Sequence, residues 1–284
     1  MQRVDHSGPT RVARRLASAT ALLAVASATG AADEAKPACP DAPEAFATVA
    51  DVSDDLSIVL SDGRKLRLSG VEPPRTTAHA PSRSQELRDA LRARLRDTTI
   101  GLAPLGAPDR WQTIPAVVFT EDGMLALSLL SRGLVRMQPD RAAAGCRESL
   151  RRSELEGRQV AGGVWSDPSL APIDADAIAP YGTPPADLLE GLVIVEGKVA
   201  SVGDTPSRLY LNLGHRRGGF AISLPKRDSA LMASDAIRRA RIVGTRLRVR
   251  GLIDRHTGLR IDVSDADAIE ILGSEPGDAV SPTP

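Results

Sequence analysis

Four carboxylate residues could bind a hard cation if the fold brings them together. They are Asp51, Asp54, Asp55 and Glu72. Calcium takes about six to eight oxygen ligands, and carboxylates are its usual protein donors. Asp54, Asp55 and Glu72 are therefore the candidate metal ligands. The alternative is an acidic loop that only faces solvent, because a metal site needs ligands that converge.

A second candidate site is a run of arginines near the C-terminus. Arg246, Arg248 and Arg250 alternate with Leu247 and Val249, so they lie on one face of a strand. Such a face could bind an anion or a nucleic acid, or it could simply be solvated. Single-stranded nucleic acid usually also stacks on aromatic side chains. The chain has only three Phe, two Tyr and two Trp.

Two cysteines, Cys39 and Cys146, are expected to form a disulfide. Residues 1–31 have a basic start, an apolar run and small residues at the end, which is typical of a secretory signal. An even number of cysteines in an exported protein favours pairing. This disulfide would close a loop of about 107 residues and contribute about 4–5 kcal/mol. The alternatives are an uncleaved N-terminal anchor and two free thiols.

The histidines do not indicate a metal centre. His79, His215 and His256 lack the spacing of zinc ligands, and His6 lies in the signal. The sequence contains no glycine-rich phosphate loop and no nucleophile elbow. No cofactor is therefore expected from these patterns.

The elements that would position the first candidate site are a run of strands and helices. Alternation from Ala47 to Ser69 predicts strands, with Val49 and Val52 in the first and an Asp-Gly turn between the next two at residues 57–60 and 65–68. Two more strands are predicted at residues 99–105 and 113–120. A helix is predicted over residues 82–97, where Leu87, Leu91 and Leu95 recur at every fourth position. Helices at residues 125–133 and 145–161 follow. This order fits a five-stranded, partly open barrel with attached helices.

The second candidate site lies in another strand-rich region. Strands are predicted at residues 192–202, 208–213, 220–224, 246–254, 259–263 and 269–272, with a helix at 229–241. The fold class is therefore mainly β with α (α+β): an OB-fold-type five-stranded barrel with helices, plus a second, C-terminal OB-like β-barrel. We expect a signal peptide (1–31), a first domain (46–166), a Pro-rich linker (167–189), a second domain (190–272) and a disordered tail (273–284).

Three motifs follow one another in the first predicted barrel. Residues 67–75 read Arg-Leu-Ser-Gly-Val-Glu-Pro-Pro-Arg, residues 109–113 read Asp-Arg-Trp-Gln-Thr, and residues 129–137 read Leu-Leu-Ser-Arg-Gly-Leu-Val-Arg-Met. With a helix that ends before Trp165, this series makes residues 47–166 similar to the staphylococcal-nuclease (thermonuclease-like) family. The resemblance implies calcium-assisted phosphodiester hydrolysis. In that chemistry two aspartates hold the metal, a glutamate acts on the attacking water, and two arginines bind the phosphate.

Most of these functional positions carry other residue types in this chain. The resemblance places the first metal aspartate on Leu56 and the second on Glu72, a carboxylate one methylene longer. The glutamate falls on Arg75, the first phosphate arginine is retained as Arg67, and the second falls on Thr113. Leu56 cannot ligate a metal. Arg75 puts positive charge where a carboxylate is needed.

Three residues remain as residual catalytic candidates: Arg67, Glu72 and Asp55. A one-residue bulge would bring Asp55 to the first metal position, and bulges are frequent at barrel rims and active sites. The water-activating glutamate and the second arginine would still be missing, and losing one such donor can cost about a hundredfold in rate. With no phosphate to bind, Arg67 is expected to pair with Glu72 or another carboxylate.

The sequence therefore predicts an exported protein, periplasmic or secreted, whose thermonuclease-like domain is catalytically inactive and acts as a binding or structural module. One alternative is a secreted calcium-dependent phosphodiesterase with a rearranged site. The other is nucleic-acid or anion binding through the C-terminal barrel. Calcium is a cofactor only in the first alternative. Nucleic acid is the only partner that the patterns suggest, and no transmembrane anchor is expected after signal cleavage.

Overall fold

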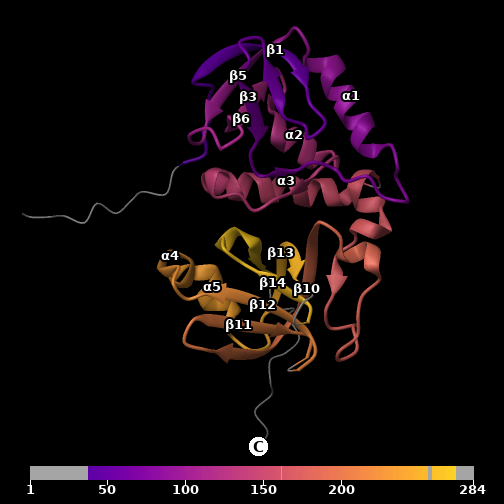
Figure 1. Ribbon diagram of the computed structural model, residues 1–284, viewed down its shortest axis with the longest axis vertical. Helices are drawn as coiled ribbons and strands as arrows, with labels where there is room; N and C mark the ends of the chain where they lie inside the picture. Colours follow the sequence, from indigo (N-terminus) through magenta and orange to yellow (C-terminus); the bar gives the residue numbers. More distant parts are fainter. Residues whose placement is uncertain (1–37, 161, 216, 255–257, 273–284) are drawn as a thin grey trace, which may run out of the picture. The chain divides into compact units, whose positions relative to one another are not determined.

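The computed structural model describes residues 38–160, 162–215, 217–254 and 258–272. The predicted signal (1–31) and the predicted tail (273–284) lie outside the described residues. Two hydrophobic cores form, one from buried side chains between residues 49 and 150, the other from buried side chains between residues 173 and 269. Each core is enclosed by its own sheet (Figure 1).

The first core lies inside a closed ring of five strands. These are β1 (Ala45–Val52), β2 (Ile58–Leu60), β3 (Lys65–Leu68), β5 (Thr99–Pro104) and β6 (Thr113–Thr120). They pair in the order β1–β2–β3–β6–β5, and β5 closes the ring onto β1. Only β3 and β6 run parallel. The ring is an OB-like barrel, as the sequence predicts.

Alternation along the strands decides which side chains fill this barrel. Ile58, Leu60, Leu66 and Leu68 are buried, and Arg67 between two of them is partly exposed. Successive side chains of a strand point to opposite faces, so Arg67 lies on the outside of the ring. The residue that could bind an anion is therefore placed by its buried neighbours.

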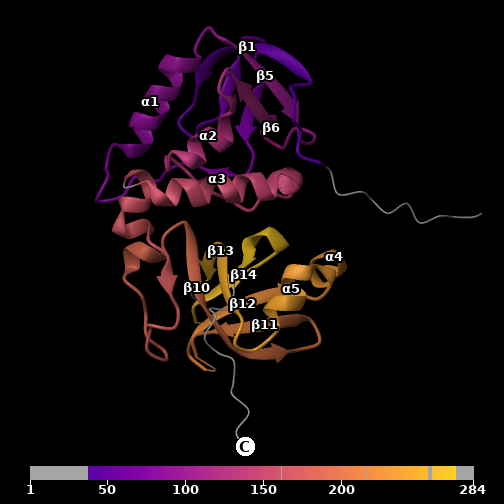
Figure 2. The same cartoon turned by 180° about the vertical axis from the view of Figure 1, so that it is seen from behind.

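Three helices pack against the first ring. They are α1 (Arg83–Leu95), α2 (Leu125–Ser131) and α3 (Arg147–Gln159), and a 3-10 turn, η1 (Arg141–Cys146), leads into α3. Leu87, Leu91 and Leu95 are buried, as their spacing predicts, and α1 lies beside β1 (Figure 2). At Gly157 a Cβ atom would lie 1.9 Å from the Leu130 carbonyl oxygen. Glycine is thus required for the close approach of α3 to α2.

A short two-stranded ladder adjoins the barrel. It joins β4 (Val71–Glu72) to β8 (Arg136–Met137), with Glu72 opposite Arg136. A further two-residue strand, β7 (Gly123–Met124), pairs antiparallel with the end of β6. The ladder matters for the site because it sets the direction in which Glu72 points.

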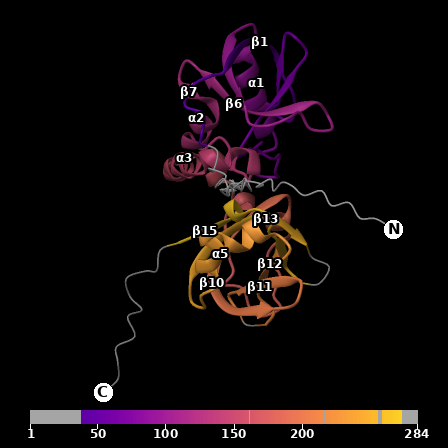
Figure 3. The ribbon, with the colours of Figure 1, turned by 90° about the vertical axis from the view of Figure 1, so that its left-hand side faces the viewer.

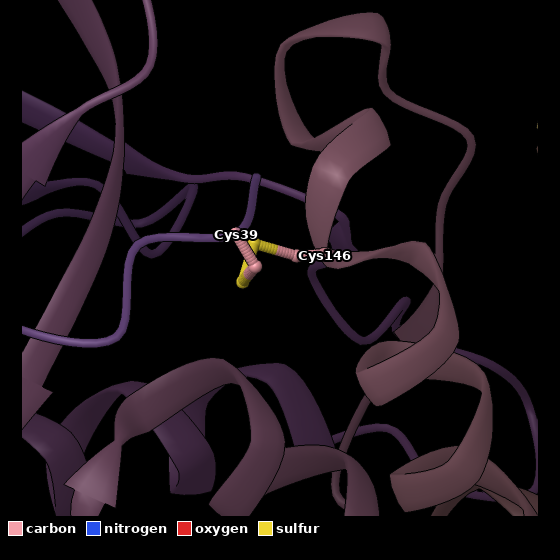
Figure 4. Close-up of a disulfide and its surroundings, with 2 residues drawn as sticks. All are labelled: Cys39 and Cys146. Carbon is pink, nitrogen blue, oxygen red and sulfur yellow. A yellow bond between two sulfur atoms is a disulfide. The ribbon is translucent and has the colours of Figure 1, made fainter. Parts of the chain in front are cut away.

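The predicted disulfide between Cys39 and Cys146 is confirmed (Figure 4). It ties the segment before β1 to the end of η1, and Cys146 belongs to the first core. The two residues are 107 positions apart in the sequence. A cross-link over so long a loop restricts the unfolded chain more than a short one does.

The second sheet repeats the pairing order of the first. Its strands are β9 (Ile173–Asp174), β10 (Leu192–Asp204), β11 (Arg208–Leu213), β12 (Phe220–Pro225), β13 (Arg246–Asp254), β14 (Arg260–Asp262) and β15 (Ile269–Ile271). Strands β10–β11–β12–β14–β13 pair in that order, and β13 returns to β10. Here too one pair of the ring, β12 and β14, is parallel. Figure 3 shows β10 to β13 curving round a common centre.

The single helix expected at residues 229–241 is divided in two. The segments are α4 (Ser229–Ala233) and α5 (Asp235–Ala240). Ser234 is extended and its side chain accepts a hydrogen bond from the Ile237 amide, so it ends α4 and caps α5. Serine is a favoured N-cap residue, which explains the interruption.

Residues 166–189 are more ordered than a linker. Ile173 and Ala175 are buried in the second core, and β9 pairs with β10. The segment also contains the 3-10 turns η3 (Pro168–Leu170) and η4 (Ala186–Leu189), after η2 (Gly163–Ser166). A last such turn, η5 (Ala266–Ala268), precedes β15. The prolines therefore shape a segment that packs on the second sheet.

Within the described ranges, no helix is long and apolar enough to cross a membrane.

Candidate functional site

The candidate site is an open pocket of about 690 Å³ on the first barrel. The loop after β1, the outer face of β3, the loop before β6 and residues 138–140 form its walls. Leu56, Arg67 and Thr113, to which the sequence resemblance assigns site positions, line this pocket, and so does the alternative candidate Asp55. Glu72 and Arg75 are not among its lining residues.

Asp55 is held by its own loop. Ser53 Oγ donates a hydrogen bond to Asp55 Oδ1 at 2.7 Å, and Ser57 donates to the same carboxylate from its amide at 3.1 Å and its hydroxyl at 3.0 Å. Partial burial opposes ionisation of Asp55, but these hydrogen bonds outweigh it and keep its pKa below the ordinary value. Both oxygens of the carboxylate are thus already used within the loop.

Leu56 fills the place where a metal ligand would be needed. Its side chain is only 3% exposed and packs in the first core. Its backbone has φ 60°, a left-handed conformation that is uncommon outside glycine. Asp55, the next residue toward the N-terminus, lines the pocket together with Arg67. Of the other loop carboxylates, Asp54 pairs with Arg88 and Asp51 pairs with Arg92.

Arg67 pairs with a carboxylate that the sequence did not single out. Its Nη1 lies 2.7 Å from Asp140 Oδ2 on the pocket wall. Asp140 also accepts a hydrogen bond from the Ala142 amide at the start of η1. The expectation that Arg67 pairs with a carboxylate is thus met by Asp140 and not by Glu72.

Glu72 points away from the pocket. Its Oε2 accepts hydrogen bonds from Nε and Nη2 of Arg136 at 3.0 and 2.7 Å. Arg136 is buried and also donates to the carbonyl oxygens of Leu170 and Leu192. The β4–β8 ladder places the two residues opposite each other, so this ion pair follows from the register. Glu72 serves to neutralise a buried arginine.

The Arg75 side chain also points away from the pocket, as Glu72 does. It donates to the Glu190 carbonyl oxygen, and its Nε lies 3.7 Å from Glu72 Oε1. A Cβ atom at Gly191 would lie 2.8 Å from Arg75 Cδ, so a larger residue there would push the Arg75 side chain aside. Burial and the neighbouring Arg136 lower the pKa of Arg75 from its ordinary value. The guanidinium contacts the start of the second sheet and takes no part in the pocket.

The residues present do not fit a calcium ion. Calcium needs several convergent oxygens, whereas here one metal position is apolar, the second carboxylate is paired with Arg136, and Asp55 is bonded to serines. Across residues 38–272, masked positions aside, no group of three or more His, Cys, Asp and Glu side chains is arranged to hold a metal.

The arginines of β13 are engaged by carboxylates. Arg246 lies 3.2 Å from Asp176, and Arg248 contacts Glu196 at 2.7 Å and Glu270 at 3.0 Å. Arg248 is buried, so the solvated-face interpretation is wrong for it. Each of these two guanidinium groups is therefore already neutralised by its neighbours, which disfavours a polyanion as their ligand.

Arg250 forms the most deeply buried ion pair of the described chain segments. Arg250 and Glu154 are each 2% exposed at the side chain, and Arg250 Nη1 donates to Glu154 Oε1 at 2.8 Å. The Met137 amide donates to the same carboxylate oxygen at 2.8 Å. Burial alone would raise the pKa of Glu154, but the guanidinium groups of Arg250 and Arg158 lower it below the ordinary value. The pair joins α3 to β13, and solvation of Arg250 is excluded.

Sequence reasoning missed Asp140, Glu154 and Trp111. Asp140 precedes a short helical turn and so carries an N-cap signal. Glu154 and Arg158 are four residues apart on a helix, a spacing that usually marks a solvated pair. Trp111 is 67% exposed on the pocket wall with the Arg110 guanidinium 3.9 Å above its ring. In the sequence, Trp111 stands out only as part of the Asp-Arg-Trp-Gln-Thr motif at residues 109–113.

The search against protein-family models found no match for this chain, and the search against curated proteins found none either.

Proposed function

We propose that the first barrel is a non-hydrolytic binding module of the thermonuclease-like type, in a protein that is exported. The observation that supports this most directly is the orientation of Glu72 and Arg75, which turn from the pocket to Arg136 and the Glu190 carbonyl. The phosphodiester hydrolysis that the thermonuclease resemblance implies needs a carboxylate and two guanidinium groups around one phosphate. Here the pocket keeps Arg67 alone of that set.

The pocket retains the means to bind. Lys65, Arg67, Asp109 and Trp111 line it together, so positive, negative and aromatic groups face one space. Arg67 is held in position by Asp140 yet stays 43% exposed at its side chain, against 10% for Arg248, so it can still meet an anionic group from solvent. Binding without bond cleavage is the function that this geometry supports best.

The second sheet, in the same proposal, is a second OB-like barrel. Its ring of strands has the pairing order of the first and the same placement of the parallel pair. Helices also follow the third strand of both rings. A chain with two such barrels resembles an adaptor more than an enzyme, since neither ring presents a convergent catalytic set among its described residues.

Hydrolysis of single-stranded DNA by the purified mature protein tests the absence of catalysis. We expect no calcium-dependent cleavage above the level of an Arg67→Ala variant prepared identically, because the variant carries the same trace contaminants. A calcium-dependent rate at least about tenfold above that of Arg67→Ala would overturn the proposal in favour of the rearranged nuclease site.

Export is tested separately by N-terminal sequencing of the protein after expression in a bacterial host. We expect a mature N-terminus close to residue 31, because small residues end the apolar run there. An intact Met1 on the accumulated protein would contradict export with cleavage. The disulfide supports export, since such bonds persist in oxidising compartments.

A further inference from the structure

A second pocket, of about 530 Å³, lies on the second sheet. It is formed by the outer faces of β11 and β12, residues 181–183, residues 218–219 and the start of β14. The chain contains two tyrosines, Tyr181 and Tyr210, and both line this pocket. No motif of the sequence pointed to it.

Tyr181 presents an exposed ring on a fixed backbone. The residue is 78% exposed and has φ 61°, a left-handed conformation that a bulky residue rarely adopts. Its amide donates a hydrogen bond to the Gly218 carbonyl oxygen at 2.7 Å. A Cβ atom at Gly218 would lie 2.8 Å from Tyr181 Cγ, so the glycine leaves room for the ring. Strained residues held this way are concentrated at functional sites.

Tyr210 supplies a second aromatic surface from β11. Leu209 and Leu211 are fully buried on either side of it, so Tyr210 points outward. Its partners on the flanking strands are Gly203 and Ser223, both small. Tyr210 is half-buried, so part of its ring faces the pocket.

Polar groups for hydrogen bonding lie beside the rings. Asn212 is two residues from Tyr210 on the same face of β11, and its Nδ2 donates to Ser201 Oγ at 2.9 Å, which orients the amide. Thr183 also lines the pocket. A pocket with aromatic surfaces and a few oriented amide and hydroxyl groups recognises both the apolar and the polar faces of a ligand.

The pocket carries almost no net charge. Arg260 is the charged residue among its described lining residues, and its guanidinium pairs with Asp254 and Asp262. Binding of nucleic acid draws most of its free energy from phosphate contacts with Lys and Arg. This pocket therefore favours a ligand without phosphates.

We propose that this pocket binds a short neutral oligosaccharide, with sugar rings stacked on Tyr181 and Tyr210 and hydroxyl groups bonded to Asn212 and Thr183. Sugar rings offer an apolar C–H face and a polar rim, which matches tyrosine surfaces beside amide and hydroxyl groups. OB folds use the face of their second and third strands for oligosaccharides as well as oligonucleotides. The inference goes beyond the proposed function, since it holds whether or not the first barrel hydrolyses phosphodiesters.

The test is a titration of the full mature protein, by calorimetry and by saturation-transfer NMR, with chitotetraose, maltotetraose and cellotetraose. We expect at least one of the three to bind with a dissociation constant on the order of 1 mM or tighter. Tyr181→Asn and Tyr210→Thr should each weaken that binding by about tenfold. Asparagine tolerates positive φ and threonine suits a strand, so both variants keep the local backbone.

Two controls separate stacking from folding. Tyr181→Phe keeps the ring and should bind as the unsubstituted protein does. Phe46→Ala removes an exposed aromatic of the first barrel outside its pocket lining and should leave binding unchanged. The proposal is overturned by the absence of binding to all three saccharides at about 10 mM, or by unchanged affinity in both tyrosine variants. Salt-dependent binding of an oligothymidylate that the tyrosine variants abolish would overturn it in favour of nucleic acid.

Discussion

The two strand rings share one pairing order but carry opposite kinds of pocket. The pocket of the first ring is lined by charged side chains, among them Lys65, Arg67 and Asp140. The pocket of the second ring is lined by two tyrosines, an asparagine and several glycines, with Arg260 neutralised by aspartates. The same scaffold therefore presents two different chemistries on its outer face.

Different side chains therefore form the ring and line its pocket. In each ring every second side chain of a strand is buried in the core, as Leu66 and Leu211 are. The neighbouring residues Arg67 and Tyr210 face outward, and they can differ in type because they add little to either core. A resemblance that rests on scaffold motifs thus says less about activity than about fold.

The largest expected effect concerns the first ring alone. Removing the disulfide with Cys39→Ser and Cys146→Ser should lower the free energy of unfolding by about 4–5 kcal/mol, because the bond restricts a loop that spans most of this ring. Denaturant titration followed by tryptophan fluorescence measures it, since Trp111 and Trp165 lie in this half of the chain. An unchanged midpoint would show that the bond is dispensable.

The next effect tests whether the two rings unfold separately. Glu154→Gln should destabilise the protein by about 3–5 kcal/mol, because it leaves Arg250 buried without its counter-charge. The double variant Glu154→Leu with Arg250→Met should lose less, since the buried Arg250 charge is removed together with its partner. Circular dichroism and tryptophan fluorescence should report one coincident unfolding transition in the unsubstituted protein, which keeps the pair. Two separated transitions would mean that the pair does not couple α3 to β13.

Acidic pH should weaken the ion pair between Glu154 and Arg250. The pKa of Glu154 is lowered on folding, so its stabilising contribution is complete above the ordinary value of 4.5 and is lost as pH falls through the folded value. Thermal unfolding measured from neutral pH down to acid should therefore show a falling midpoint below that value. Glu154→Gln serves as the control, and its midpoint should fall less steeply. Parallel curves for the two proteins would contradict the assignment.

The smallest effect is expected at the charged pocket. Arg67→Ala should change the free energy of unfolding by less than about 1 kcal/mol, because the pair with Asp140 is partly exposed to solvent. Denaturant titration of this variant beside Arg64→Ala, which removes an exposed ion pair away from the pocket lining, provides the matched comparison. A loss of several kcal/mol at Arg67 alone would mean that the residue is structural, and would remove the reason to regard this pocket as a binding site.

Much of the scaffold was predictable, because it depends on local patterns. The strands at Thr113–Thr120, Arg208–Leu213 and Arg246–Asp254 have the predicted bounds, and the leucines of α1 are buried as their spacing requires. The prediction of one continuous helix at residues 229–241 was wrong, because Ser234 caps a second helix within that range. Local hydrogen bonding by a serine side chain competed with helix continuation.

The ion-pair partners of individual side chains were far less predictable from the sequence than the helices and strands. Arg248 and Arg250 alternate with apolar residues and look like a solvated face, yet they are buried against Glu196, Glu270 and Glu154. Those carboxylates lie 22 to 96 residues away in the sequence. Periodicity shows which side chains share a face, but it does not show what packs against that face.

Local periodicity and cysteine parity were enough to predict the two strand-rich regions and the disulfide. Only the tertiary structure decided that Glu72 and Arg75 turn away from the pocket, that Asp140 pairs with Arg67, and that both tyrosines meet on the second sheet. The physical reason is the same in each case. A side chain takes the partner that strand register and burial bring within reach, and that partner is distant in sequence.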